Sequence, residues 1–238
     1  MRPRIKPGIY PTLRDVLRDT DGLLRGAPDS AAAREAWRAL FARHAAAPGD
    51  FAALPVGDAC LLVDLGLRLH MTDGEYDRAG ALLDLLFSHP RAGRMGKTAE
   101  AIFRCKKGEA LLASGEERQA VAAFGAVAAG VGDGRYHRDA LDNVVYRLYG
   151  HARREREDGD RPPSRALADF VGQVADAFGG SPRDSPRDSP RAAAGGVRDG
   201  PHEPGHEPGH EPSYEDLAAR LEAAFPIPDG WRRRRDHS

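Results

Sequence analysis

The chain has 238 residues, a formal net charge of −1 and only 7% aromatic residues. This balance of charge excludes a global field that would draw the chain to nucleic acid or a membrane. No window reaches the roughly 18 uninterrupted apolar residues of a membrane span. Nor does an apolar stretch follow Met1, as it would in a signal peptide, so we expect a cytoplasmic protein. Much of the apolar content is alanine, and alternating strand patterns are absent from the sequence, so we expect an all-α fold.

Apolar residues repeat with helical spacing in successive segments, which glycine and proline turns separate. In chain order the expected helices cover 12–25, 30–46, 58–71, 75–88, 98–114, 116–129, 136–157 and 164–178. The segment 58–71 is apolar on most sides, which places it in the interior of a helical domain. Thr98 is expected to cap the helix that follows a short basic loop at 91–97.

The composition changes after Gly179. Ser-Pro-Arg-Asp and His-Glu-Pro-Gly units repeat in tandem here, and a proline at every fourth position forbids a helix. An amphipathic helix is expected beyond this segment, with Leu217, Leu221 and Phe225 on one face. We therefore predict an extended arm (1–11), an all-α domain (12–178), a disordered low-complexity linker (179–212), a short helix (213–225) and a basic tail (226–238).

Small and bulky residues between 101 and 132 have the spacing of a helix–turn–helix repeat. Gly108 and Ala120 are small residues on successive expected helices, Gly115 lies at the turn between them, and Phe124 follows one helical turn after Ala120. The segment resembles one tetratricopeptide repeat, in which facing small residues let the two helices approach closely. The resemblance implies antiparallel helical hairpins stacked into an α-solenoid, with a generic helical bundle as the alternative.

An earlier copy of the pattern contains Gly74, Tyr76, Ala79 and Leu83. Ala79 lies 41 residues before Ala120, whereas the family period is 34, and an insertion of about seven residues in the 91–97 loop would account for the difference. This copy departs from the pattern because Leu67 stands where a small residue is expected.

The resemblance implies a binding scaffold. The first helix of each repeat would line a groove for a peptide or a partner helix, so we expect a non-enzymatic protein-interaction adaptor. The lysines and asparagines with which the family clamps a C-terminal carboxylate are missing, so capture of a C-terminus is not expected. The implied groove residues are Asp64, Arg68, Met71, Cys105, Lys106, Glu109 and Leu112.

The C-terminal tail offers an alternative function. Four adjacent arginines could contact nucleic-acid phosphates while a neighbouring indole stacks on a base. Positive and negative residues nearly balance over the whole chain, and this balance argues against strong binding of nucleic acid. The residues of this alternative are Trp231, Arg232, Arg233, Arg234 and Arg235.

No catalytic, metal or cofactor site is predicted. Gly96-Lys97-Thr98 lacks the earlier glycine of a phosphate-binding loop. The string from His202 to His206 spells a zinc-protease motif, but its proline and glycine prevent the helix that this chemistry needs. The histidines of the expected helices are scattered along the chain.

Overall fold

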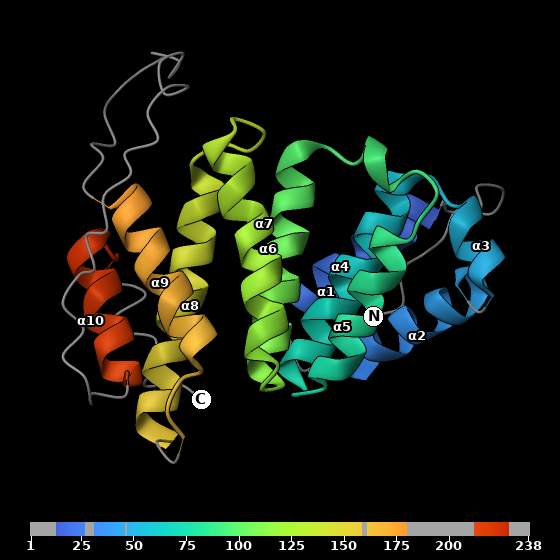
Figure 1. Ribbon diagram of the computed structural model, residues 1–238. Helices are drawn as coiled ribbons and strands as arrows, with labels where there is room; N and C mark the ends of the chain where they lie inside the picture. The colour runs from blue at the N-terminus through green and yellow to red at the C-terminus, as the bar shows by residue number, and fades with distance from the viewer. Residues whose placement is uncertain (1–12, 27–30, 46, 159–160, 180–211, 229–238) are drawn as a thin grey trace, which may run out of the picture. The chain divides into compact units, whose positions relative to one another are not determined.

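The computed structural model describes residues 13–26, 31–45, 47–158, 161–179 and 212–228. Every regular element among these residues is a helix (Figure 1), which confirms the expected all-α fold. None of the described helices is both long enough and apolar enough to cross a membrane. The elements are α1 (Leu13–Gly26), α2 (Ala31–His44), α3 (Pro48–Ala53), α4 (Val56–Thr72), α5 (Tyr76–Phe87), the 3-10 turn η1 (Ala92–Arg94), α6 (Lys97–Ala113), α7 (Glu117–Gly132), α8 (Asp139–Asp158), α9 (Arg165–Phe178) and α10 (Tyr214–Ala224).

The chain forms two compact units, residues 1–144 and 145–238, and the division falls inside α8. The sequence-based domain 12–178 therefore spans this division. In the first unit α4 packs against α5, α5 against α6 and α6 against α7, while α1 and α2 pack against each other and against α4 (Figure 1). In the second unit α10 packs against α9.

The α4–α5 and α6–α7 hairpins turn in the same way. Gly74 and Gly115 adopt positive φ angles of 71° and 82°, which glycine reaches without the steric cost of a side chain. The amide of Glu75 then donates to the carbonyl of His70, and the amide of Glu116 donates to that of Leu111, both at 2.8 Å. These bonds satisfy the last carbonyls of each first helix and reverse the chain within a few residues.

Close helix approach depends on a glycine in each first helix. A Cβ at Gly108 would lie 2.5 Å from the ring of Phe124, so the ring packs directly on the α6 backbone. In the earlier hairpin a Cβ at Gly66 would lie 2.7 Å from the Leu82 side chain on α5, and 2.4 Å from the Trp37 ring on α2. Leu67, which stands where the repeat pattern expects a small residue, is itself buried. The small residue of this helix lies one position earlier, at Gly66.

The structure corrects two predicted helix starts and contains one short helix that was not predicted. This helix, α3, begins at Pro48, where a first-turn proline costs no hydrogen bond. Helix α4 begins at Val56 rather than at Asp58. Thr98 does not cap α6, because the helix begins one residue earlier, after Gly96. The arm 1–11, the linker residues 180–211 and the tail from residue 229 lie outside the described residues.

Candidate partner-binding surfaces

The predicted groove residues of α4 and α6 form an ion-pair network. The Lys106 ammonium binds the Asp64 carboxylate, which also accepts hydrogen bonds from Arg68 Nε at 3.1 Å and Nη2 at 2.6 Å. Arg68 Nη1 lies 2.8 Å from a carboxylate oxygen of Asp21 on α1. We call Asp21, Asp64, Arg68 and Lys106 the ion-pair network. It joins α1, α4 and α6, so these charges are neutralised within the first unit.

The network lowers the pKa of Asp64. Burial by itself would raise this pKa, but the charge and hydrogen bond of Lys106, together with those of Arg68, outweigh it. The Asp64 side chain is only 23% exposed, so water screens these attractions less than at an open surface. The carboxylate therefore stays charged and acts as a structural link between the two hairpins.

The other predicted groove residues divide into buried and half-buried positions. Cys105 and Leu112 are 0% and 2% exposed, so they belong to the interior and offer no surface to a partner. The Cys105 thiol donates to the carbonyl of Ala140 at 3.8 Å. Met71 and Glu109 are half-buried. Only part of the implied groove is therefore accessible.

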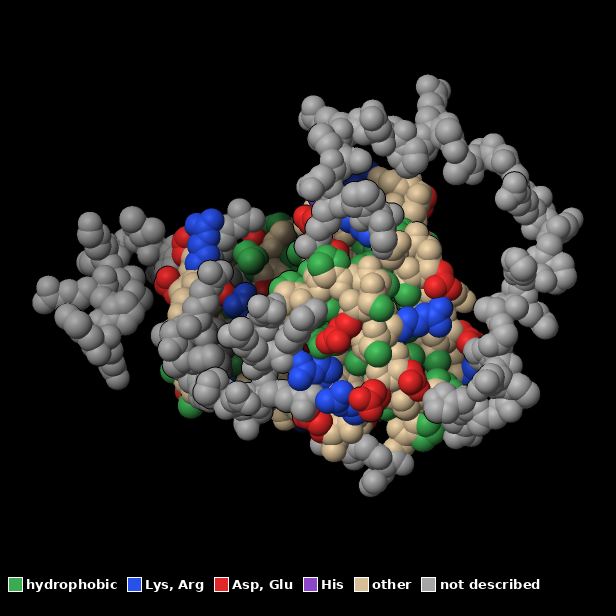
Figure 2. Space-filling model, turned by 90° about the vertical axis from the view of Figure 1, so that its left-hand side faces the viewer, with side chains coloured by type: hydrophobic (Ala, Val, Ile, Leu, Met, Phe, Trp, Pro, Cys, Tyr) green, Lys and Arg blue, Asp and Glu red, His purple; other side chains and the backbone are tan. Residues whose placement is uncertain are grey.

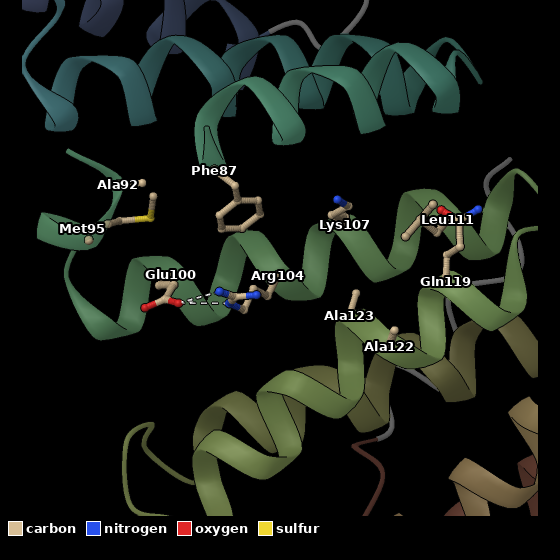
Figure 3. A pocket seen from close by; sticks show the side chains of 11 residues that line it. Phe87, Ala92, Met95, Glu100, Arg104, Lys107, Leu111, Gln119, Ala122 and Ala123 are labelled. Atoms are coloured by element: carbon tan, nitrogen blue, oxygen red, sulfur yellow. Dashed lines mark hydrogen bonds and ion pairs between the residues drawn. The ribbon is translucent and has the colours of Figure 1, made fainter. Parts of the chain in front are cut away.

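A different side of α6 faces an open pocket of about 570 Å³ (Figure 3), which we call the α6 pocket. Glu100, Arg104, Lys107 and Leu111 are spaced three or four residues apart and so form one stripe on α6, on the opposite side from Lys106. Three of these four side chains are charged, and the pocket that they border lies between α5 and α7. The apolar lining residues are Phe87, Ala92, Met95, Leu111, Ala122 and Ala123.

The guanidinium of Arg104 is held in place from two sides. Its Nε and Nη2 donate to one carboxylate oxygen of Glu100 at 3.0 and 2.9 Å, and its Cζ lies 5.1 Å from the centre of the Phe87 ring. Figure 3 shows these three side chains together at one end of the pocket, with Leu111 and Gln119 at the other end. The arginine is thus preoriented beside an apolar lining.

Glu100 is a charged carboxylate in this arrangement. Burial would raise its pKa, but the nearby Tyr136 hydroxyl and the Arg104 guanidinium lower it further than burial raises it. Lys107, the other cation of the stripe, binds the carboxylate of Asp84 on α5.

The nucleic-acid alternative rests on Trp231, Arg232, Arg233, Arg234 and Arg235, and these lie outside the described residues. Figure 2 shows Lys and Arg side chains beside Asp and Glu side chains on one face, with no continuous area of one sign among the coloured residues. Within the described ranges, no group of three or more His, Cys, Asp or Glu side chains is arranged to hold a metal ion. No family model, curated protein or solved structure matches this chain.

The α6 pocket was not predicted from the sequence. Its walls come from α5, η1, α6 and α7, and their separation depends on how these elements pack. One sequence signal points to it, namely the charged residues Glu100, Arg104 and Lys107 on the side of α6 that faces neighbouring helices. Charges at helical spacing also occur on ordinary solvated faces, so this pattern alone does not identify a pocket.

Proposed function

We propose that this protein is a non-enzymatic interaction scaffold that binds a segment of a protein partner in the α6 pocket. The main observation behind this proposal is that one open pocket combines a partly apolar lining with the preoriented guanidinium of Arg104. Protein-binding sites use such combinations, since apolar anchors supply burial and a fixed arginine supplies direction. The size of the pocket, about 570 Å³, suits one or two large side chains.

The electrostatics of the pocket favour binding over acid–base catalysis. A general acid or base works best when its pKa lies near the working pH. The pKa of Glu100 is instead lowered, because Tyr136 and Arg104 together outweigh the effect of its burial. A carboxylate that is held charged by an arginine is a poor proton acceptor and a good positioning group.

The ion-pair network supports the same proposal in a structural role. A scaffold must hold its helices in register while a partner binds, and the Lys106–Asp64 pair joins α6 to α4 between the two hairpins. The pocket itself lies on the opposite side of α6. The proposal therefore assigns Asp64, Arg68 and Lys106 to the rigidity of the scaffold and assigns Arg104 and its neighbours to contact with the partner.

The proposal is tested by selecting binders to the full chain from a display library of random peptides of about twelve residues. Ala122→Trp, which would fill the pocket from α7, should abolish binding of the selected peptides. Ala126→Trp is the matched control, because Ala126 is exposed on the same helix and does not line the pocket. Failure to enrich any peptide, or equal loss in both variants, would contradict the proposal.

A further inference from the structure

The loop between α5 and α6 places a group of cations next to the α6 pocket. Ala92, Gly93 and Met95 of this loop form one wall of the pocket. Arg91 and Arg94 belong to the same turn, whose backbone is closed by the bond from the Arg94 amide to the Arg91 carbonyl at 2.9 Å. Lys97 begins α6 directly after this turn. We call Arg91, Arg94 and Lys97 the rim cations.

The rim cations are available to a partner. All three residues are exposed, and none of them forms an ion pair with a carboxylate in the described part of the chain. The carboxylates at the pocket are already engaged, because Glu100 is bound by Arg104 and Asp84 is bound by Lys107. The pocket therefore has an excess of positive charge on one side of its apolar lining.

The rim cations and the apolar lining together indicate the chemistry of the partner. We infer that the α6 pocket selects an acidic protein segment, in which a bulky apolar side chain stands close to two or more Asp or Glu residues. The apolar side chain packs against Phe87 and Met95, while the carboxylates lie against the rim cations. The inference rests on the function proposed above and adds the charge of the partner segment to it.

Charge complementarity supports this choice over other occupants. A basic segment would meet the rim cations with like charge, which disfavours docking. A nucleic acid would satisfy the rim cations, but its phosphates would leave the apolar lining unused. An acidic segment with an apolar anchor uses both features at once, and the preoriented Arg104 can bind one further carboxylate at the end of the pocket where it lies with Glu100 and Phe87.

The first test determines the amino-acid composition of the peptides that the full chain selects from the random library. Enriched peptides should contain at least two acidic residues within about four positions of a Leu, Ile, Phe or Trp. Enrichment of neutral or basic peptides that Ala122→Trp still blocks would overturn the acidic specificity while leaving the scaffold function intact. A failure of the scaffold function itself would instead appear as no enrichment at all.

The second test reverses the charge of the rim. In the variant Arg91→Glu/Arg94→Glu/Lys97→Glu, the affinity for a selected acidic peptide should fall at least about tenfold, as measured by fluorescence anisotropy. The fold should survive, since all three residues are exposed and a glutamate at the first position of α6 suits the helix dipole. Circular dichroism and the melting temperature check this point.

A control variant with the same change in net charge separates local from global electrostatics. Arg18→Glu/Arg38→Glu/Arg43→Glu alters three exposed arginines of α1 and α2, none of which lines the pocket. The control should bind the peptide with less than about a threefold change in Kd. Equal weakening by both variants, or displacement of the peptide by single-stranded DNA with higher affinity, would overturn the inference.

Discussion

The Lys106 ammonium on α6 binds the Asp64 carboxylate on α4, and these two residues are 42 positions apart in the chain. The pair joins the first helices of two successive hairpins. Asp64 is at the same time bound by Arg68, which in turn reaches Asp21 on α1. Residues that the sequence suggested as a binding groove thus hold three helices of the first unit together.

Replacement of Asp64 by Asn should lower the free energy of unfolding at pH 7 by about 1–3 kcal/mol, because Lys106 and Arg68 lose a half-buried carboxylate partner. The loss should depend on pH in a defined direction. Burial raises the pKa of Asp64 and the cations lower it further, so its folded pKa lies below its unfolded one. Its contribution is therefore present above the unfolded pKa and is lost as the pH falls through the folded pKa.

Urea unfolding of both proteins between pH 7 and pH 3 measures this dependence. The difference between wild type and Asp64→Asn should be largest at neutral pH and should shrink in the acid range. Glu35→Gln is the control, since Glu35 is exposed on α2 and its replacement should change stability by less than about 0.5 kcal/mol. A difference that stays constant across the whole pH range would show that the network does not stabilise through the charge of Asp64.

Gly108→Ala should destabilise the first unit by about 1–3 kcal/mol, because the added methyl group would lie 2.5 Å from the Phe124 ring and overpack the α6–α7 contact. Gly80→Ala is the matched control within α5, where nothing lies within 4 Å of the added Cβ. It should stabilise by about 0.5–1 kcal/mol, since alanine is the better helix former. Thermal unfolding of the two variants, followed by circular dichroism, should shift in opposite directions; a neutral Gly108→Ala would contradict the close approach.

Helices and turns were predictable from local patterns. Glycines at turns, such as Gly74 and Gly115, marked hairpins that the structure contains with positive φ angles. The short helix α3 was missed because glycine and proline were taken to mark the turns between helices, although proline also suits the first turn of a helix. Local sequence does not decide between these two uses.

The binding surfaces were harder to predict, because they depend on how helices pack. Helical spacing correctly placed Asp64 and Arg68 on one face of α4, but their pairing with Lys106 is set by the register between hairpins. The burial of Cys105 depends in the same way on neighbouring chain, such as the carbonyl of Ala140. The α6 pocket is the clearest case, since several separate elements enclose it and none of them encodes it alone.

His89→Leu should destabilise the first unit by about 1–3 kcal/mol. The imidazole is 4% exposed, and its Nδ1 accepts from the Arg91 amide at 3.0 Å. Nε2 must therefore carry the proton that it donates to the Leu54 carbonyl at 3.2 Å. Leucine would fill the space but leave both backbone groups without their partner.

Since His89 fixes the start of the turn that carries Arg91, the same variant should also weaken binding of a selected acidic peptide. Urea unfolding and fluorescence anisotropy measure the two effects. His137→Leu is the control, because the His137 side chain is 79% exposed and its loss should change stability by less than about 0.5 kcal/mol. Unchanged unfolding of His89→Leu would mean that these two hydrogen bonds contribute nothing to the turn.

The last helix is part of the core of the second unit, which makes a further substitution informative. Leu221 of α10 is 0% exposed and α10 packs against α9. The helix starts with a capping box, in which Ser213 accepts from the Asp216 amide while the Asp216 carboxylate accepts from the Ser213 amide. Arg220 ties the two helices further by pairing with Asp176 at 3.0 Å.

Leu221→Ala should therefore destabilise the second unit by about 2–4 kcal/mol, through lost burial and the cavity that remains. Hydrogen exchange followed by mass spectrometry measures this at the amides of α9, which should exchange faster in the variant. Ala223→Gln is the control, because Ala223 is exposed on the same helix and glutamine is well tolerated in helices. If α9 exchanged equally fast in wild type and Leu221→Ala, the packing of α10 would not contribute to the stability of α9, and the helix would be free to serve a partner instead.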